Sequence, residues 1–215
     1  GERSVAYRAS EKAVICGDIW APEMHLASNG KWYVYTSGRV SPADPWWKKR
    51  LFILESKTRD PFDGFIFRGI PDERLNAIDP TVFSISDGVS YVCYSEITRT
   101  SRGQVLVVRE MKNPWTFGPR RAEISRPELK WELDRNLVNE GPFFICDASG
   151  RKSLLVYSGN GCFNDDYSLG VIEFTGGEVF ASESWKKRPD PLLVKGNGMY
   201  GPGHASFFRS PDGKE

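Results

Sequence analysis

Three prolines in this chain are each followed eight residues later by a glycine, and the pairs recur at a regular interval. The pairs are Pro22 with Gly30, Pro80 with Gly88, and Pro142 with Gly150. Each glycine precedes a strand-like run, namely Trp32–Ser37, Tyr91–Ser95 and Leu154–Ser158. The interval is roughly 60 residues, and Gly213 continues it. A period of that size with about four short strands is typical of a β-propeller blade with long loops.

Helical periodicity is nearly absent between these markers, and short β-branched and aromatic runs alternate with Gly, Pro, Asn, Asp and Ser clusters. The expected strands are Lys31–Thr36, Leu51–Ser56, Ser90–Ser95, Gln104–Glu110, Val138–Cys146, Leu154–Ser158 and Leu169–Phe174. The expected turns are Ser28–Gly30, Asp87–Gly88, Ser149–Gly150, Gly176–Gly177 and Pro211–Gly213. The fold class is therefore all-β, and 215 residues suit one domain, residues 1–215.

Charge and aromatic content limit the classes of partner. Lys and Arg total 29 against 28 for Asp and Glu, which argues against a nucleic-acid or polybasic membrane surface. Aromatic residues make up 13% of the chain, enough to fill a β-rich core or to line a site for flat or apolar ligand faces. We interpret the four widely spaced cysteines mostly as buried thiols, with a disulfide open if the protein is secreted.

The segment before each turn is expected to be the innermost strand of its blade. Innermost strands line the central channel of a propeller, so equivalent positions of successive blades converge on one axial pocket. The segments that should meet there are Trp20–Glu23, Asp79–Pro80, Glu140–Pro142 and Gly203–His204.

Glu140 is the strongest candidate for chemistry. It opens a strand-like segment, and Gly141 and Pro142 should bend the backbone where its carboxylate lies. A glutamate at the edge of an apolar strand is partly desolvated, which raises its pKa and suits it to donate a proton near neutral pH. A solvated loop glutamate is the alternative reading of this local pattern.

Four motifs in order carry a family resemblance over essentially the whole chain. They are Trp20-Ala21-Pro22-Glu23, Ala77-Ile78-Asp79-Pro80, Asn139-Glu140-Gly141-Pro142 and Gly201-Pro202-Gly203-His204. With them the chain resembles glycoside hydrolase family 43, five-bladed β-propellers that cleave arabinose and xylose linkages. The ending from Trp185 through Gly198–Phe208 looks most like its exo-acting α-L-arabinofuranosidases.

The resemblance implies a role for each matched residue. Glu140 would be the general acid, Asp79 the carboxylate that orients it and adjusts its pKa, and Trp20 a surface for a sugar. His204 would lie near the channel axis and help to hold a metal ion, often calcium, largely through water. The resemblance implies no organic cofactor, a pentose-containing oligo- or polysaccharide as partner, and an extracellular, secreted protein, although no signal peptide opens the chain.

Structural roles are the alternatives at each position. Asp79 before Pro80 could serve only a turn, Trp20 could pack between blades, and His204 could be a satisfied structural histidine. A second group, Glu23, His25, Asn160 and Asp166, could support the site or be ordinary loop residues.

One element of the family pattern is missing. The general base of this family is an Asp in an Asp-Pro motif of the first blade, upstream of the Trp-Ala-Pro-Glu motif. Here Asp18 has no following proline, and Asp44-Pro45 comes after Trp20. We expect the first blade and the end of the last to be missing, which leaves roughly three and a half blades, a partial catalytic domain without activity of its own.

The function expected from these observations is an inverting glycosidase for α-L-arabinofuranosides of plant polysaccharide. A β-D-xylosidase is the nearest alternative within the enzymes, since the same pocket takes either pentose. A carbohydrate-binding propeller that has lost the chemistry is the alternative from another class.

Overall fold

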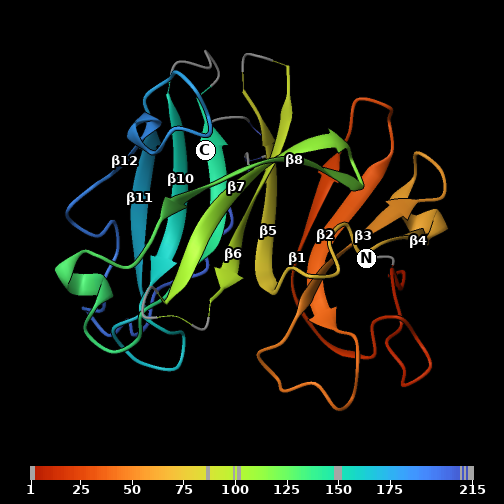
Figure 1. Cartoon of the computed structure of the whole chain (residues 1–215), viewed down its shortest axis with the longest axis horizontal. Coiled ribbons are helices and arrows are strands. Elements are labelled where there is room, and N and C mark those ends of the chain that lie inside the picture. Colours follow the sequence, from red (N-terminus) through yellow and green to blue (C-terminus); the bar gives the residue numbers. More distant parts are fainter. Residues whose placement is uncertain are drawn as a thin grey trace.

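The chain folds into three four-stranded antiparallel sheets that lie side by side (Figure 1). The structure is a computed structural model and describes residues 3–85, 88–98, 100, 103–147, 152–208, 210 and 212. The first sheet contains β1 (Gly17–Leu26), β2 (Trp32–Arg39), β3 (Arg50–Ser56) and β4 (Phe65–Gly69). The second contains β5 (Ala77–Ser84), β6 (Ser90–Ile97), β7 (Gln104–Asn113) and β8 (Thr116–Ser125). The third contains β9 (Asn139–Cys146), β10 (Ser153–Gly159), β11 (Ser168–Phe174) and β12 (Trp185–Lys187).

Each sheet is an up-and-down meander, and its first strand lies where the sheets meet. Within a sheet the strands follow chain order, so β1, β5 and β9 each form one edge. The three edge strands converge, with β5 in contact with both β1 and β9. Short 3-10 turns η1 (Pro61–Asp63), η2 (Lys130–Glu132) and η3 (Ser182–Ser184) lie in the connections. The three sheets are thus propeller blades, with their innermost strands side by side as the repeat predicts.

The second sheet is buried on both faces, which explains its continuous apolar runs. Side chains alternate across a strand, so Val92 and Tyr94 of β6 pack into the cluster shared with the first sheet. Tyr91 and Cys93 pack into the cluster shared with the third. Burying each such side chain contributes about 1.5–3 kcal/mol, and an aromatic stack of Phe83 on Phe144, with centroids 4.1 Å apart, joins the second and third sheets.

The outer faces of the end sheets are covered by the chain's own terminal segments. Tyr7 packs on Phe52 and Phe67 of the first sheet, with ring centroids 5.5 and 6.0 Å away. On the third sheet, Ala205 packs against the cluster that contains Val156. Beyond β12 the described residues 188–208 contain only isolated bridges and no strand. The expected half blade is therefore irregular chain, which leads back to the inner strands.

The strands expected in the three sheets are present, with ends that differ by a few residues. The innermost strand expected at Gly203–His204 was wrong, because that segment is irregular chain. Three strands were missed: β4, β8 and β12. They are outer strands, and β8 carries Pro119, Arg120 and Arg121, which are tolerated at a solvent-facing edge but hide the strand pattern. The expected turn at Ser149–Gly150 and parts of those at Asp87–Gly88 and Pro211–Gly213 lie outside the described residues.

The expectation of mostly buried thiols was wrong for half of the cysteines. All four are free: Cys93 is buried and Cys16 is partly buried, whereas Cys146 and Cys162 are exposed because they lie at a strand end and in a loop. In the part of the chain that the structure describes, no helix is long and apolar enough to cross a membrane.

Candidate active site

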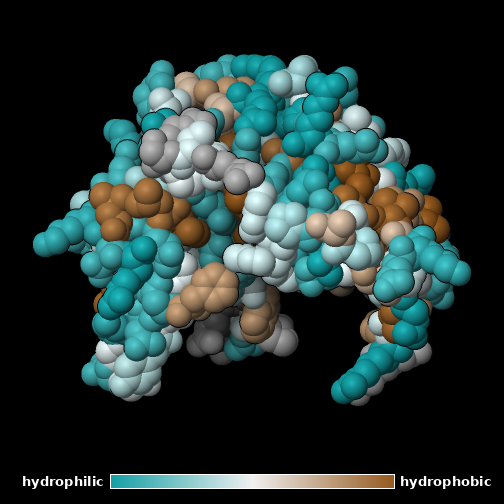
Figure 2. Space-filling model, turned by 60° about the horizontal axis from the view of Figure 1, so that its bottom comes forward, coloured by the Kyte–Doolittle hydropathy of each residue, from teal (hydrophilic) through white to brown (hydrophobic). Residues whose placement is uncertain are grey.

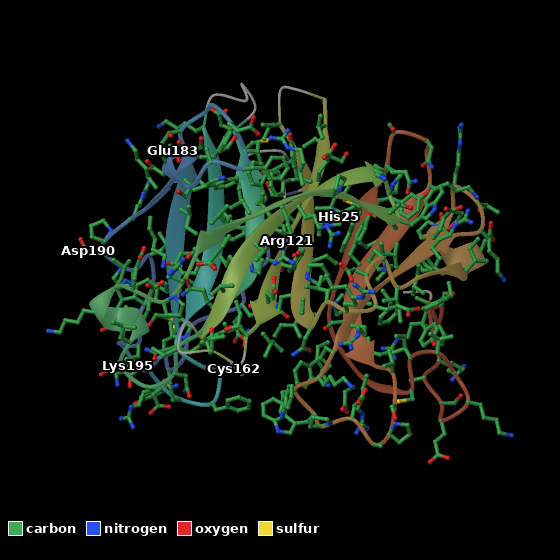
Figure 3. All side chains as sticks on the ribbon, in the orientation of Figure 1. His25, Arg121, Cys162, Glu183, Asp190 and Lys195 are labelled. Carbon is green, nitrogen blue, oxygen red and sulfur yellow. The ribbon has the colours of Figure 1, made fainter. Side chains whose placement is uncertain are left out.

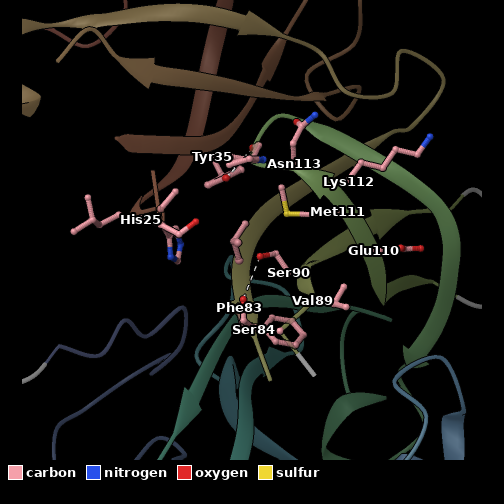
Figure 4. Close-up of a pocket in the computed structure, with 16 residues that line it drawn as sticks. His25, Tyr35, Phe83, Ser84, Val89, Ser90, Glu110, Met111, Lys112 and Asn113 are labelled. Atoms are coloured by element: carbon pink, nitrogen blue, oxygen red, sulfur yellow. Dashed lines mark hydrogen bonds between the residues drawn. The ribbon is translucent and has the colours of Figure 1, made fainter. Parts of the chain in front are cut away.

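Two large hollows lie at opposite ends of the inner strands. One, near the ends of β1 and β5, is lined by His25, Tyr35 and Met111 among others (Figure 4). Of its described lining residues only Glu110 carries a carboxyl group, so it offers no acid pair. The other has a volume of about 770 Å³, and Trp20, Asp79, Glu140 and His204 all line it. The structure therefore brings together all four residues that the sequence singled out.

The second cavity opens on the edge that carries Cys162, at the bottom of the view in Figure 3. Figure 2 turns that edge forward and shows that the surface is hollowed there. The described lining comes from all three sheets and is rich in aromatic side chains, among them Trp46, Phe163 and Tyr167. Its size is within the range of small-molecule sites.

The same bulge recurs in every inner strand and aims residues at this cavity. β1, β5 and β9 each carry an extra residue relative to the neighbouring strand, at Ala21-Pro22, Asp79-Pro80 and Gly141-Pro142. Ala21, Asp79 and Gly141 all have positive φ, at 46°, 55° and 55°. Proline cannot donate to the ladder, so it fits a bulge, and a bulge changes the direction of the side chains beside it.

Strand pairing sets the relative position of the two carboxylates. Trp20, Ile78 and Glu140 occupy equivalent positions, because each lies opposite a serine of the neighbouring strand: Ser37, Ser95 and Ser158. Asp79 is one residue further along its strand than the position equivalent to Glu140. The two carboxylates thus come from adjacent blades with a one-residue offset, which places Asp79 against the Gly141 backbone.

Glu140 is 9% exposed and is held by a short chain of hydrogen bonds. Gln104 Nε2 donates to Glu140 Oε2 at 3.0 Å and to Ser95 Oγ at 2.9 Å. Ser95 Oγ donates in turn to the Asn139 carbonyl at 2.7 Å. Burial, and next the charge of Asp79, raise the pKa of Glu140 to about 7. The group therefore retains its proton up to neutral pH, as a general acid must.

Tyr167 lies beside the same carboxyl group. Its ring is 4% exposed, and its interaction with Glu140 opposes part of the pKa rise of that carboxyl. Its hydroxyl nevertheless has no hydrogen-bond partner of normal geometry among the described residues. A buried hydroxyl without a partner is costly, so a polar group of a ligand in this cavity would find a ready partner there.

Asp79 is 6% exposed and accepts a hydrogen bond from the Gly141 amide, with N and Oδ2 3.0 Å apart. Burial raises the pKa of Asp79 to about 7, the Gly141 hydrogen bond opposes this rise, and the charge of Glu23 adds to it. A left-handed backbone at a residue other than glycine is strained, and such strain is concentrated at functional sites. The geometry goes beyond simple turn chemistry, because the carboxylate links two blades.

Trp20 lies at the rim of the cavity, and its ring contacts a buried cation. Lys49 Nζ is 3.9 Å from the centroid of the Trp20 ring, and Lys49 is fully buried. Asp18 Oδ2 lies 3.2 Å from both Lys49 Nζ and Arg39 Nε, so its charge is neutralised. Asp18 does not line the cavity, and the described lining residues contribute no carboxylates other than Asp79 and Glu140. The described lining of the cavity therefore contains two carboxyl groups and no third.

His204 approaches the site from the irregular tail. Its amide donates to Ser158 Oγ at 2.7 Å, and its Nδ1 lies 4.0 Å from Asp79 Oδ2. No group of three or more His, Cys, Asp or Glu side chains that could hold a metal is present in the described part of the chain. Calcium takes six to eight oxygen ligands, so this donor set fits a metal only if water supplies most of them. We therefore assign no step of the reaction to a metal ion.

Two features of the structure favour glycine at position 141. Its φ of +55° disfavours other residues, and a Cβ would lie 3.2 Å from His204 Cγ. We expect Gly141→Ala to lower the free energy of unfolding by about 1–2 kcal/mol and to displace His204. Gly176→Ala is the matched control, because Gly176 also has positive φ but has open space around it. Equal losses in chemical unfolding would show that the His204 contact contributes nothing.

The residues that the sequence left uncertain have mainly structural contacts. Glu23 Oε2 and His25 Nε2 pair at 2.9 Å. Asn160, 1% exposed, donates to the Trp131 carbonyl and accepts from the Arg135 amide, so it holds two loops together. Asp166 pairs with Lys195 at 2.6 Å. Sequence reasoning missed the lining residues Gln104, Tyr167, Trp46 and Phe163, since a strand start and loop aromatics give no local signal.

The family profile described as Glycosyl hydrolases family 43 matches residues 3–215. The chain belongs to that family. As the description says, members of this family are glycosyl hydrolases. The predicted family and the predicted partial five-bladed propeller are both confirmed.

Relatives within family 43 include named arabinofuranosidases. The chain is 33% identical to the extracellular exo-α-(1→5)-L-arabinofuranosidase of Streptomyces chartreusis, over 98% of this chain and 64% of the relative. It is 30% identical to α-L-arabinofuranosidase 43 of Humicola insolens, over 98% of this chain and 44% of the relative. The crystal structure of α-L-arabinofuranosidase from Lactobacillus brevis superposes with a TM-score of 0.85 at 25% identity, over 96% of this chain and 66% of that one. The chain thus spans less than two thirds of these relatives.

Proposed function

We propose that the complete protein is an inverting, secreted α-L-arabinofuranosidase that acts on arabinose-containing plant polysaccharide. The observation that carries this proposal is the pair of buried carboxyl groups, Glu140 and Asp79, in an aromatic cavity between blades. Support for the substrate and for secretion comes from relatives named extracellular α-L-arabinofuranosidases.

Glu140 acts as the general acid in the proposed reaction. Its proton passes to the glycosidic oxygen while the bond from that oxygen to the anomeric carbon breaks. A water molecule attacks the same carbon from the opposite face, and a second carboxylate takes its proton, which leaves an inverted sugar and a free alcohol. Because the described residues of the cavity contain no carboxylate for that base, we assign it to another part of the complete protein. The acid and base carboxyls should then be ~6.5–9.5 Å apart.

In this proposal the remaining residues contact the substrate, adjust the pKa of Glu140 or hold the site in shape. One face of the Trp20 ring packs against the arabinose unit, and the Lys49 cation lies over the other face. Asp79 fixes the Gly141 backbone beside Glu140 and raises the pKa of the acid by its charge. The hydrogen bond from the His204 amide to Ser158 holds His204 at the channel side of the site.

The test compares two substrates that differ only in the pentose. The complete protein should release nitrophenol faster from 4-nitrophenyl α-L-arabinofuranoside than from 4-nitrophenyl β-D-xylopyranoside, and proton NMR should show the β-anomer of arabinose as first product. The reverse preference would indicate a β-D-xylosidase. Binding of arabino-oligosaccharide without any turnover would indicate the non-catalytic alternative.

Replacing Asp79 should change the pH profile in a defined direction. The ionised Asp79 raises the pKa of Glu140, so Asp79→Asn should lower that pKa and move the alkaline limb of kcat/KM to lower pH. We expect a loss of roughly tenfold at pH 8 and a smaller loss at pH 5, where Asp79 is already protonated. The asparagine oxygen can still accept from Gly141. An alkaline limb at unchanged pH would contradict the assigned role.

A further inference from the structure

A continuous aromatic wall leaves the catalytic pair and reaches solvent. The rings of Trp20 and Trp46 have centroids 6.1 Å apart, and those of Trp46 and Phe163 are 6.2 Å apart at an interplanar angle of 86°. Trp46 is 57% exposed and Phe163 is 81% exposed, yet both line the cavity that contains Glu140. An edge-to-face contact leaves at least one face of each ring free.

The two outer rings come from blades that are not neighbours. Trp46 lies in the connection between β2 and β3, and Phe163 in the connection between β10 and β11. These loops belong to the first and third sheets, with the second sheet between them. They meet across the mouth of the cavity, at the edge where Figure 3 labels Cys162. A contact that spans two blades is unnecessary for packing within either sheet.

Both loops are held in shape before any ligand binds. The Lys48 amide donates to the Pro45 carbonyl at 2.9 Å, which closes a turn around Trp46. Asn164 Nδ2 donates to the Gly161 carbonyl at 2.8 Å, which closes a turn around Phe163. Exposed rings on preorganised loops bind a ligand with little loss of conformational entropy.

The Phe163 loop lies on the acid side of the site. Its residues Cys162 and Phe163 line the same cavity as Glu140. A general acid protonates the oxygen of the leaving group, so the leaving group must lie on the side of Glu140. Trp20, at the other end of the wall, then faces the sugar that is released.

We propose that Trp46 and Phe163 form the binding platform for the first sugar of the leaving group, a neutral pentose unit of an arabino-oligosaccharide. The C–H face of a furanose ring is apolar and matches an uncharged aromatic surface, while its hydroxyl groups remain in water. This inference rests on the proposed function. It adds that the enzyme selects a saccharide, and not merely any alcohol, on the leaving side.

The test compares two substrates with chemically similar leaving groups. Methyl α-L-arabinofuranoside and (1→5)-α-L-arabinobiose both release an alkanol, but only the second has a sugar ring on that side. In the complete protein, Phe163→Ala should lower the ratio of kcat/KM for arabinobiose over the methyl glycoside by about tenfold, mainly through KM, and Trp46→Ala should act in the same direction. Phe62→Ala, which removes a 52% exposed ring from η1, should leave the ratio unchanged.

The outcomes separate this inference from the proposed function. Hydrolysis of both substrates with an unchanged ratio in Phe163→Ala would overturn the platform and leave the proposed function intact. If neither substrate is hydrolysed, the proposed function fails, and measurements of saccharide binding then test the platform of Trp46 and Phe163. Calorimetry should then show tighter binding of arabinotriose than of arabinose, with the difference lost in Phe163→Ala; equal affinities in the unmodified protein would overturn the inference.

Discussion

Glu140→Gln should reduce kcat for (1→5)-α-L-arabinobiose by about 10³-fold, because an alkanol leaves poorly without a proton and Gln cannot supply one. 4-Nitrophenyl α-L-arabinofuranoside releases a far more acidic alcohol, so its loss should be only about tenfold. The change keeps the size of the side chain. Steady-state kinetics of the complete protein with both substrates measure the two losses. Equal losses would contradict the assignment of Glu140 as the proton donor.

The stability of the same variant at two pH values is a control for correct folding. Glutamate starts from a pKa of 4.5, and burial raises the pKa of Glu140 to about 7 in the fold. Between these values the native state binds more protons than the unfolded state, so this group lowers stability as pH rises. Glu140→Gln should therefore be more stable than the parent by about 3 kcal/mol at pH 8 and equally stable at pH 4. Thermal unfolding at both pH values separates lost catalysis from lost structure.

The inner strands could be predicted because proline marks each bulge. Pro22, Pro80 and Pro142 cannot pair in the ladder, so their spacing reports the blade period directly. The outer strands could not be predicted as well, because they are partly solvent-exposed and their side chains need not alternate. The repeat fixes which strands meet at the centre, and sequence reasoning therefore found the residues that lie beside the prolines.

The rest of the site depends on contacts between segments far apart in the chain. Gln104 looks like an ordinary first residue of a strand, and it reaches Glu140 only because β7 pairs with β6 in register. Tyr167 and Phe163 follow β10 in a loop whose shape depends on the buried amide of Asn160. The contact of Asp79 with the Gly141 amide depends on two bulged strands lying side by side, and no local pattern distinguishes such a bulge from a turn.

Lys187→Met should destabilise the protein by about 3–5 kcal/mol, because it leaves a buried carboxylate without its cation. Glu132 is fully buried and lies 2.8 Å from Lys187 Nζ. It also accepts hydrogen bonds from Asn139 Nδ2 and the Tyr157 hydroxyl, each at 2.8 Å. Chemical unfolding of the variant and of the parent near neutral pH measures the loss.

Two further variants show whether the unpaired charge is the cause. Adding Glu132→Gln to Lys187→Met should recover part of the loss, since no charge then remains buried. Arg188→Met removes a neighbouring but exposed cation, 3.1 Å from Glu173, and should cost less than about 1 kcal/mol. A loss in Lys187→Met as small as this would refute the argument. Because Asn139 precedes Glu140 and accepts from Lys187 at 3.1 Å, a confirmed loss would also show that this network holds the backbone of the proposed acid.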